Sequence, residues 1–451
     1  MKTLLLVLAA CTWSSSVWAQ GKAYIPVGQA KTKKTVIAYT DSKPMLIQGN
    51  PDPTDLARTI RDTAMADLTF MEIFKFMDRG AFIEDKSAGL TPDKFKLSDW
   101  TSIGAEFLVK SKITRDANTL TFEAYVYDTF GAKQLLAKKY VATVIEAKII
   151  GHSLANDIVE VLTGLRGIFT TKITMSCDRR SNVKEIYVMN FDGSEVKQIT
   201  SHRSIALAPG WSPDSSKIAY SLFTKRRSNN IKNIDLYEYN FNTNTIRMLS
   251  NRQGINSGAA YSPDGKRIAL TMSFLGNPEI FSFDPNDKTV TRLTKSLGED
   301  VDPAWSPDGK ELAFVSTRSG KPMVFAMNLA GGNIRRLTFA GDYNATPTWS
   351  PTNNKIAFAG WIDGMFDIFI MNPDGTNIER LTKNQGNNED PHFSPDGNFI
   401  TFSSNRTGEK NIYVMNVDGT FVKRLTYGLG NCVAPKWSQF PVKPRFAEPK
   451  K

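Results

Sequence analysis

The second half of the chain repeats one short phrase, and this repetition limits what the chain can fold into. Copies of the phrase, which vary around Arg-Leu-Thr, end at Thr200, Ser250, Thr294, Thr338, Thr382 and Thr426. Their spacings are 50, 44, 44, 44 and 44 residues, a period typical of propeller blades. A second phrase related to Trp-Ser-Pro-Asp-Gly runs in step with the first and begins at Trp211, Tyr261, Trp305, Trp349, Phe393 and Trp437. The two phrases together indicate a ring of similar units.

One complete copy, residues 302–338, shows what each unit contains. Its apolar runs predict four short strands. Pro307, Asp308 and Gly309 predict a tight turn between the first two, because proline presets φ near about −65° and glycine readily adopts positive φ. A lone four-stranded sheet cannot bury both faces, so neighbouring sheets must stack around an axis. Six copies therefore predict an all-β, six-bladed propeller over residues 168–440.

The first and last copies indicate how the ring closes. The first copy begins at Lys172 with no Trp-Ser-Pro strand before it, and the missing innermost strand corresponds to residues 434–438. We therefore expect a C-terminal strand to complete the first blade. Cys177 and Cys432 fall at the facing ends of these strands, and an oxidising compartment would allow them to form a disulfide. Two buried thiols are the alternative that the residues leave open.

Residues 35–167 lack the repeat and predict an α/β domain, which makes the chain a two-domain protein. Apolar residues recur every four positions after residue 54, so we expect an amphipathic helix capped by Thr54 or Asp55. Ser98 is the expected cap of a second, short helix. The remaining expected elements are strands at residues 35–39, 106–114, 120–127 and 134–141, the last three in an antiparallel meander, and a helix at residues 146–162.

The first residues of the chain have the pattern of a secretory signal peptide. Lys2 precedes an apolar run at residues 4–10, and Val17, Trp18 and Ala19 form a cleavage pattern. We expect cleavage after Ala19 and export of the mature protein, with lipoprotein processing at Cys11 as the less favoured alternative. Residues 20–34 are expected to form an N-terminal arm, and residues 441–451 a C-terminal tail.

Composition and motifs argue against several other functions. The net charge is +11, but Lys and Arg are scattered through the repeats, so we expect no nucleic-acid binding. After the signal, no segment has the roughly 18 consecutive apolar residues of a membrane helix. The three histidines, His152, His202 and His392, lie in unrelated elements and predict no metal site. Gly-x-Ser-x-Gly and P-loop motifs are absent from the sequence, and we expect neither enzymatic activity nor a cofactor.

The combination of features resembles one protein family. An export signal, an α/β domain ending in LTGLRGIF, six repeats and a displaced last strand are similar to the TolB family of periplasmic propeller proteins, part of the Tol-Pal system of Gram-negative bacteria. The resemblance covers about residues 23–440. The 50-residue spacing of the second copy, with the basic insert Lys225, Arg226 and Arg227, departs from the pattern.

The resemblance implies a monomeric binding protein of the periplasm. Members of the family bind the lipoprotein Pal over the propeller channel mouth and contact TolA through the N-terminal arm, and their system maintains the outer membrane and assists its constriction at cell division. An exported propeller enzyme or a glycan-binding protein is the alternative.

The resemblance implies two sets of binding residues. The loops that follow each Arg-Leu-Thr phrase share one face of the expected propeller. Their candidate Pal-binding residues are His202, Arg203, Arg252, Gln253, Glu299, Asp300, Asp342, Tyr343, Asn344, Asn388, Glu389 and Asp390. The candidate TolA-binding residues of the arm are Tyr24, Ile25 and Val27.

Overall fold

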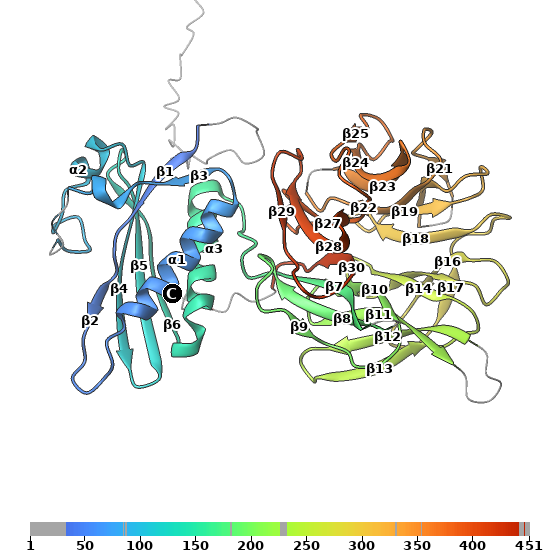
Figure 1. Cartoon of the computed structure of the whole chain (residues 1–451), viewed down its shortest axis with the longest axis horizontal. Coiled ribbons are helices and arrows are strands. Elements are labelled where there is room, and N and C mark those ends of the chain that lie inside the picture. The colour runs from blue at the N-terminus through green and yellow to red at the C-terminus, as the bar shows by residue number, and fades with distance from the viewer. Residues whose placement is uncertain are drawn as a thin grey trace, which may run out of the picture.

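The protein consists of an α/β domain beside a propeller (Figure 1). The computed structural model describes residues 33–83, 85, 88–180, 183–225, 232–329, 332–352, 354–441 and 446. Within these ranges, no helix has the length and apolar character needed to cross a membrane. The expected signal peptide, Cys11, and the arm residues Tyr24, Ile25 and Val27 lie outside the described residues.

The N-terminal domain is built on one mixed sheet. Strand order is β3-β1-β4-β5-β6, and β2 pairs with β4. The predicted meander is confirmed, because β4, β5 and β6 are antiparallel. Strands β2 and β3 were not predicted, since each has only three residues. The elements are β1 Thr35–Tyr39, β2 Lys43–Met45, α1 Thr54–Phe70, β3 Phe74–Phe76, α2 Leu97–Ser102, β4 Phe107–Asp116, β5 Thr119–Asp128, β6 Lys133–Thr143 and α3 Ala147–Thr163.

The helix ends correct two of the expected caps. Helix α1 is capped by neither Thr54 nor Asp55, because the Asp52 carboxylate accepts hydrogen bonds from the Thr54 backbone N–H at 2.9 Å and its hydroxyl at 2.6 Å. Helix α2 begins at Leu97, so Ser98 lies inside it. Helix α3 ends where Gly164 takes φ of 76°, a left-handed conformation that glycine adopts without steric cost.

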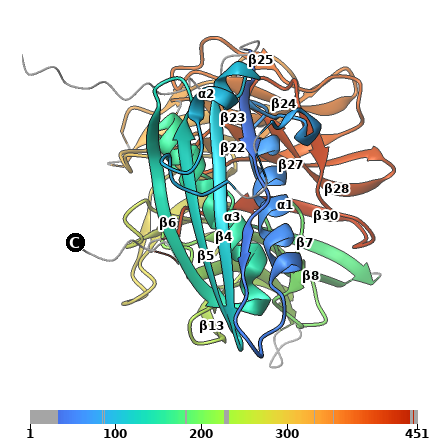
Figure 2. The ribbon, with the colours of Figure 1, turned by 90° about the vertical axis from the view of Figure 1, so that its left-hand side faces the viewer.

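Helices α1 and α3 cover one face of the sheet and lie between the sheet and the propeller (Figure 1). Ile60 and Leu68 from α1 and Ile150 and Leu154 from α3 are fully buried in the core they share. Figure 2 views the molecule from the sheet side, with the propeller behind. The other face of the sheet packs against Trp100 of α2. The domain is therefore two-layered over most of its sheet.

The propeller has six four-stranded antiparallel sheets, as predicted from the repeats. In each blade the strands run in order from the channel outwards. The consecutive blades are β10 Ala206–Trp211, β11 Lys217–Lys225, β12 Lys232–Asn240, β13 Thr245–Ser250; β14 Asn256–Tyr261, β15 Ile268–Met272, β16 Glu279–Phe283, β17 Val290–Arg292; β18 Asp300–Trp305, β19 Glu311–Ser316, β20 Met323–Asn328, β21 Arg335–Arg336; β22 Asn344–Trp349, β23 Ile356–Ile362, β24 Met365–Met371, β25 Glu379–Arg380; and β26 Asn388–Phe393, β27 Phe399–Thr407, β28 Glu409–Asn416, β29 Val422–Arg424.

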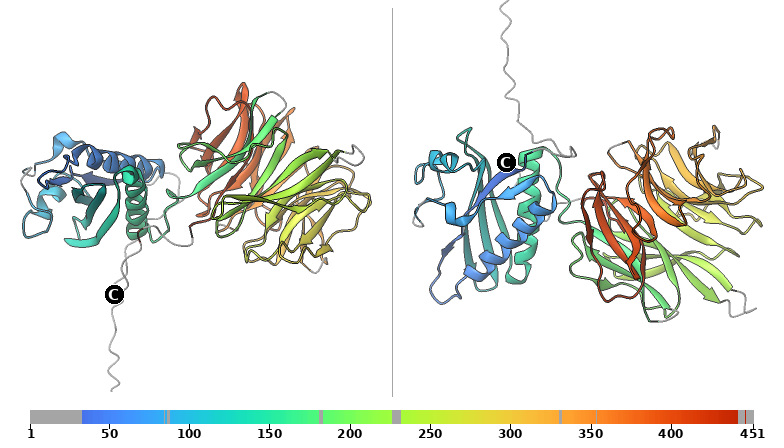
Figure 3. Two further views of the ribbon diagram at one scale, coloured as in Figure 1. Left: turned by 90° about the horizontal axis from the view of Figure 1, so that it is seen from below. Right: turned by 45° about the horizontal axis from the view of Figure 1, so that its top comes forward.

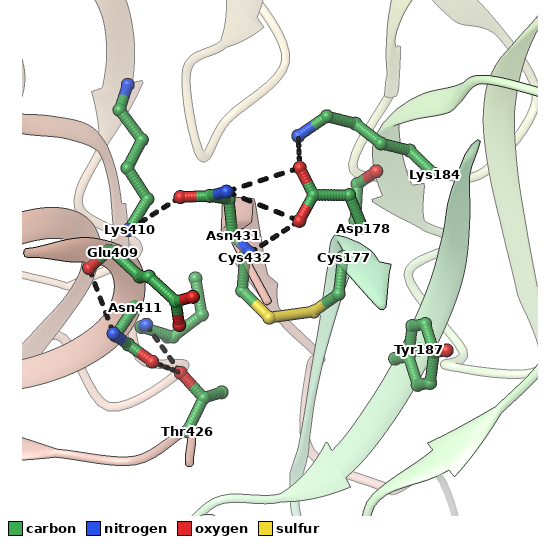
Figure 4. The surroundings of a disulfide bond; sticks show 12 residues. Cys177, Asp178, Lys184, Tyr187, Glu409, Lys410, Asn411, Thr426, Asn431 and Cys432 are labelled. Atoms are coloured by element: carbon green, nitrogen blue, oxygen red, sulfur yellow. Dashed lines mark hydrogen bonds and ion pairs between the residues drawn. A yellow bond between two sulfur atoms is a disulfide. The ribbon is translucent and has the colours of Figure 1, made fainter. Parts of the chain in front are cut away.

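The remaining blade combines both ends of the propeller sequence, as predicted. Strand β30 Cys432–Trp437 pairs antiparallel with β7 Lys172–Arg180, followed by β8 Val183–Asn190 and β9 Lys197–Gln198. The Trp437 indole N–H donates to the Thr171 hydroxyl at 2.7 Å. A disulfide joins Cys177 to Cys432 at the far end of the same strand pair (Figure 4). Beside it, the Asp178 carboxylate accepts from the Asn431 backbone N–H at 2.6 Å.

The repeated residues stabilise the blades. The hydroxyl of Thr294, which ends one phrase, accepts from the Ile280 backbone N–H at 2.9 Å, and Thr382 does the same for Ile368. In the turn after an innermost strand, the Asp264 carboxylate accepts from the Ser262 hydroxyl at 2.6 Å. Each motif thus satisfies backbone or turn groups within its own blade.

An aromatic cluster joins the two domains. The Phe70 ring, at the end of α1, lies 5.3 Å from the ring of Phe191, 4.9 Å from that of Phe399 and 5.5 Å from that of Phe421. These three propeller residues flank turns at the ends of blade strands, on the side opposite the loops that join successive blades. The N-terminal domain therefore leaves the blade-joining loops uncovered, and the two domains meet at one side of the propeller (Figure 3).

Candidate functional site

The blade-joining loops define one surface, which we call the loop face. It consists of residues 201–205, 251–255, 295–299, 339–343, 383–387 and 427–431, each of which connects an outermost strand to the next innermost strand. Because strands alternate in direction, the loops between second and third strands, such as residues 273–278, lie on the same side.

Large apolar side chains are exposed on the loop face. Leu297 is fully exposed, and Phe339 and Tyr427 keep 72% and 68% of their surface accessible. Each of the two aromatic rings is held by an arginine of its own blade. The Arg336 guanidinium lies 5.0 Å from the centre of the Phe339 ring, and that of Arg424 lies 4.5 Å from the centre of the Tyr427 ring. Apolar side chains that are exposed and also held in place by a neighbouring arginine are suited to bind a protein surface.

Several predicted residues accompany them. Arg203, Gln253, Glu299, Asp342 and Tyr343 are exposed on the loop face. Asp342 forms an ion pair with Lys321. This part of the face therefore presents charges of both signs around the apolar groups.

His202 and Arg252 are half-buried at the rim. His202 Nε2 lies 2.7 Å from the Tyr220 hydroxyl, and burial lowers the pKa of this imidazole. The Arg252 guanidinium lies 5.7 Å from the centre of the Phe274 ring. Both side chains are thus partly engaged within the propeller.

Three predicted contact residues are instead structural. Asp300, Asn344 and Asn388 are each at most 4% exposed and occupy the first position of an innermost strand. Asp300 pairs with Arg318 at 2.8 Å. The amide of Asn344 donates to the Ala340 carbonyl and that of Asn388 to the Asp367 carboxylate, each at 2.9 Å. Their side chains point into the blade and cannot contact a partner in this structure.

The last two predicted residues are the second and third residues of β26, directly after the fifth loop, residues 383–387. Glu389 forms an ion pair with Lys410 at 2.9 Å. Asp390 lines the channel, where its carboxylate accepts from the Ala434 backbone N–H at 3.0 Å and the Ser403 hydroxyl at 3.1 Å.

A ring of left-handed residues surrounds the channel. The third residue of every innermost strand has φ between 48° and 67° and sits at a register shift against the second strand. These bulges re-aim side chains, and all six positions line one cavity of about 750 Å³. The six residues are Ala208, Gly258, Asp302, Thr346, Asp390 and Ala434.

Charged groups within this cavity have altered pKa values. Burial raises the pKa of the Asp302 carboxyl and lowers that of the Lys436 ammonium, while each group's charge offsets part of the effect on the other. Burial, with the nearby charge of Lys436, lowers the pKa of His392 to about 3. His392 is therefore neutral at pH 7, and its Nδ1 accepts from the Trp437 backbone N–H at 3.1 Å.

The described residues contain no cluster of three or more His, Cys, Asp or Glu side chains suited to hold a metal.

Sequence reasoning missed Leu297, Phe339 and Tyr427 on the loop face, and Asp302 and Lys436 in the channel. A signal existed for two of them, because Phe339 and Tyr427 directly follow an Arg-Leu-Thr phrase, where an aromatic residue has no strand to pack against.

Comparison with models of known protein families shows which family the chain belongs to. A model described as the TolB amino-terminal domain matches residues 23–135. A model described as the TolB beta propeller domain matches residues 159–360 and 344–441, which is more than half of the chain. The chain belongs to the TolB family.

Individual members of the TolB family agree with this assignment. The chain is 37% identical to the Tol-Pal system protein TolB of Syntrophotalea carbinolica and 39% identical to that of Geobacter metallireducens, over 215 residues in each case. These alignments span 48% of this chain and 48% of each relative, so the chain spans about half the length of the curated relatives it matches. The crystal structure of TolB from Acinetobacter baumannii superposes with a TM-score of 0.76 at 25% identity, covering 92% of this chain and 100% of that one. The likeness of the fold therefore extends over both domains.

Proposed function

We propose that this chain is a periplasmic, non-enzymatic component of the Tol-Pal system that binds Pal on its loop face. The curated relatives named above are called Tol-Pal system proteins, and family membership supports the same system here. The observation that carries the proposal is the exposure of Leu297, Phe339 and Tyr427 on the loop face. This surface lies opposite the side on which the N-terminal domain docks.

The chemistry of the loop face is that of a protein-binding surface. Binding energy at such surfaces is concentrated in a few large, desolvated anchors, and the exposed leucine and aromatic rings provide them. Charged side chains at the rim, including Arg203 and Glu299, set orientation and the rate of encounter more than affinity. Pal would therefore cover the apolar groups and face the charged ones.

The N-terminal arm is proposed to bind TolA. Tyr24, Ile25 and Val27 are aromatic and β-branched residues, the types suited to a segment that adds as a strand to a partner's sheet edge. They lie outside the described residues, so this part of the proposal rests on the sequence and the family. With cleavage after Ala19, the arm would begin the mature chain. Through both partners the protein would support outer-membrane integrity and constriction at division.

The loop face is tested by calorimetric titration of Pal, from the same bacterium, into the mature protein. The double variant Phe339→Ser/Tyr427→Ser should weaken binding by about 10-fold to 100-fold, because two anchors are lost. Ile378→Ser is the matched control, since Ile378 is 45% exposed on the opposite side of the propeller. Equal affinity of all three proteins would place the interface elsewhere.

The arm is tested by pull-down with TolA and Pal in parallel. Deletion of residues 20–28 should reduce TolA capture and leave Pal capture equal or stronger. Retained TolA capture would show that another surface binds TolA. A loss of both would indicate damage to the fold, which a melting curve of the deletion variant checks.

A further inference from the structure

The fold gathers on one part of the loop face basic side chains that are scattered along the sequence. The end of the β7–β8 hairpin, the loop between β9 and β10 and the end of the β11–β12 hairpin lie side by side. The Lys184 backbone N–H donates to the Ser204 carbonyl at 2.9 Å, and the Ser204 hydroxyl to the Phe223 carbonyl at 2.7 Å. The loop between β13 and β14 follows, since the Asn233 amide donates to the Arg252 carbonyl at 3.1 Å. We use the name basic sector for the side chains of Arg179, Arg203, Lys225, Lys232 and Arg252 in these segments.

The carboxylates near the basic sector are engaged inside the propeller. In the described residues of these segments they belong to Asp178, Glu185 and Asp235. The Asp178 carboxylate accepts from a backbone N–H at 2.6 Å (Figure 4), and Glu185 and Asp235 are only 5% and 7% exposed. The rest of the loop face differs, because Glu299 and Asp342 are exposed there. The basic sector therefore presents charge of one sign to solvent.

The exposed cations of the basic sector do not stabilise the fold. Among the described residues, no ion pair within 4.0 Å joins Arg203, Lys225 or Lys232 to a carboxylate. Lys225 and Lys232 lie directly opposite each other at the end of the β11–β12 hairpin, and like charges in this position destabilise a strand pair. Arg203 has φ of 56°, a left-handed conformation that is unfavourable for a bulky residue. A partner of opposite charge would relieve the repulsion between the two lysines.

An aromatic ring accompanies the two lysines of the hairpin. Side chains two positions apart on a strand point to the same face, so Phe223 shares a face of the hairpin with Lys225 and with Lys232 opposite it. Phe223 is 39% exposed. The other face of the hairpin is engaged, because the Thr224 hydroxyl donates to the Asp235 carboxylate at 2.7 Å. The hairpin thus presents an exposed aromatic ring beside two cations.

We infer that the basic sector binds the surface of an anionic lipid bilayer. Its cations come from separate segments, so the partner must offer negative charge over an extended area, as the phosphate headgroups of a bilayer do. The Phe223 ring enters the boundary between headgroups and acyl chains, where aromatic side chains beside cations are favoured. An acidic protein surface would offer the charge without an apolar layer beneath it. The basic sector contains none of the loop-face anchors that we propose for Pal, and lipid binding does not require Pal.

The test is co-sedimentation of the mature protein with lipid vesicles. Vesicles of phosphatidylethanolamine and phosphatidylglycerol supply the anionic surface, and vesicles of phosphatidylcholine are the neutral comparison. The protein should bind the anionic vesicles at least about tenfold more tightly than the neutral ones, and added salt should weaken this binding because it screens the charges. Absence of binding to the anionic vesicles, or equal binding to both kinds, would overturn the proposal.

Variants locate the lipid-binding surface. Lys225→Gln/Lys232→Gln should weaken binding to anionic vesicles about 25-fold, which is about fivefold for each cation, whereas Lys225→Arg/Lys232→Arg should keep the parent affinity. Lys266→Gln/Lys288→Gln is the matched control, because it removes the same charge from exposed turns on the opposite side of the propeller. Phe223→Ser should weaken the binding that remains at high salt. Equal weakening by the two glutamine pairs would contradict the assignment to the basic sector.

Pal titrated into the same variants without lipid separates this inference from the proposed function. Vesicle binding by a protein that does not bind Pal would contradict only the proposed function. If Lys225→Gln/Lys232→Gln weakened Pal binding and left vesicle binding unchanged, the basic sector would belong to a protein partner, and the inference would be overturned. Melting curves show that each variant is folded, and removal of the opposed lysines should not lower the melting temperature.

Discussion

Cys177 on β7 and Cys432 on β30 lie directly opposite each other in the closing strand pair, although 255 positions separate them in the sequence. Every other blade is formed from consecutive strands, whereas this one is completed by the last strand of the ring. The disulfide and the Trp437 hydrogen bond to Thr171 lie at opposite ends of this pair. Closure of the ring therefore depends on a few identifiable contacts.

Removal of the disulfide should destabilise the propeller. A crosslink over so long a loop restricts the unfolded chain, and such bonds commonly contribute about 2–4 kcal/mol. We expect Cys177→Ala/Cys432→Ala to lower the free energy of unfolding by this amount, measured by denaturant titration. Reducing agent should lower the melting temperature of the parent protein and leave the double variant unchanged. A parent mass that does not increase by about two units on reduction would show that the bond does not form.

Loss of β30 should be more severe. A chain ending before Val433 leaves β7 as an unpaired inner edge. It also lacks Trp437, which is 1% accessible in the intact protein, so the core that this side chain covers becomes exposed. We expect the cooperative thermal transition of the propeller to be lost or shifted strongly downwards. A chain ending after Phe446 is the control, because it retains the strand and the contact of Phe446 with Tyr140. Identical melting curves of the two truncated chains would contradict the role of β30 in closing the ring.

The propeller was largely predictable because each blade uses the same letters for the same task. Thr294 and Thr382 bind backbone groups at equivalent points, so a periodic structure produces a periodic sequence. The displaced strand was visible for the same reason, as one copy lacked its first phrase. Strands β2 and β3 had no such signal, since three residues are too few for a pattern.

The site was less predictable because neighbouring positions in a loop have opposite environments. Glu299 is exposed, whereas Asp300 is buried against Arg318. Sequence polarity does not distinguish these two carboxylates. The channel charges depend on the bulge that directs Asp302 inwards, and bulges leave little trace in a single sequence. Loop position was thus predictable, but side-chain direction was not.

Asp300→Ala should affect stability and leave Pal binding intact. Removing the carboxylate leaves Arg318 largely buried without its charge partner, and breaking a buried pair commonly costs about 3 kcal/mol or more. Denaturant titration should show this loss, and the folded variant should bind Pal with parent affinity. A variant with parent stability and weakened Pal binding would return Asp300 to the interface.

Charge reversal at the rim should act mainly on association. Arg203→Asp/Arg252→Glu removes two cations from the loop face and introduces two anions, so we expect slower Pal association and a changed salt dependence. Surface plasmon resonance at low and high salt measures both. Lys266→Gln/Lys288→Gln, on exposed turns away from the loop face, is the control. Unchanged association rates in the reversed variant would exclude these arginines from the encounter.

A buried pair beside the domain junction should make stability depend on pH. His152 Nδ1 lies 2.7 Å from the Asp67 carboxylate, and the His152 ring contacts that of Phe191 with centres 6.0 Å apart. Burial raises the pKa of Asp67 to about 6. Burial alone would lower the pKa of His152, but the Asp67 carboxylate, with Asp192 and Glu195 nearby, raises it above its usual value.

Both shifts mean that the folded protein binds more protons than the unfolded chain between about pH 4 and pH 7. The stability that the pair contributes is therefore greatest at the acid end and decreases as the pH rises through the folded pKa values. Relative to Asp67→Asn/His152→Gln, the parent protein should lose on the order of 1 kcal/mol between pH 5 and pH 8. Denaturant titrations across this range measure the difference. Lys75→Gln is the control, because a lysine side chain does not change its charge between pH 5 and pH 8. A parent protein that gains stability over the same range, relative to the double variant, would contradict the direction of both shifts.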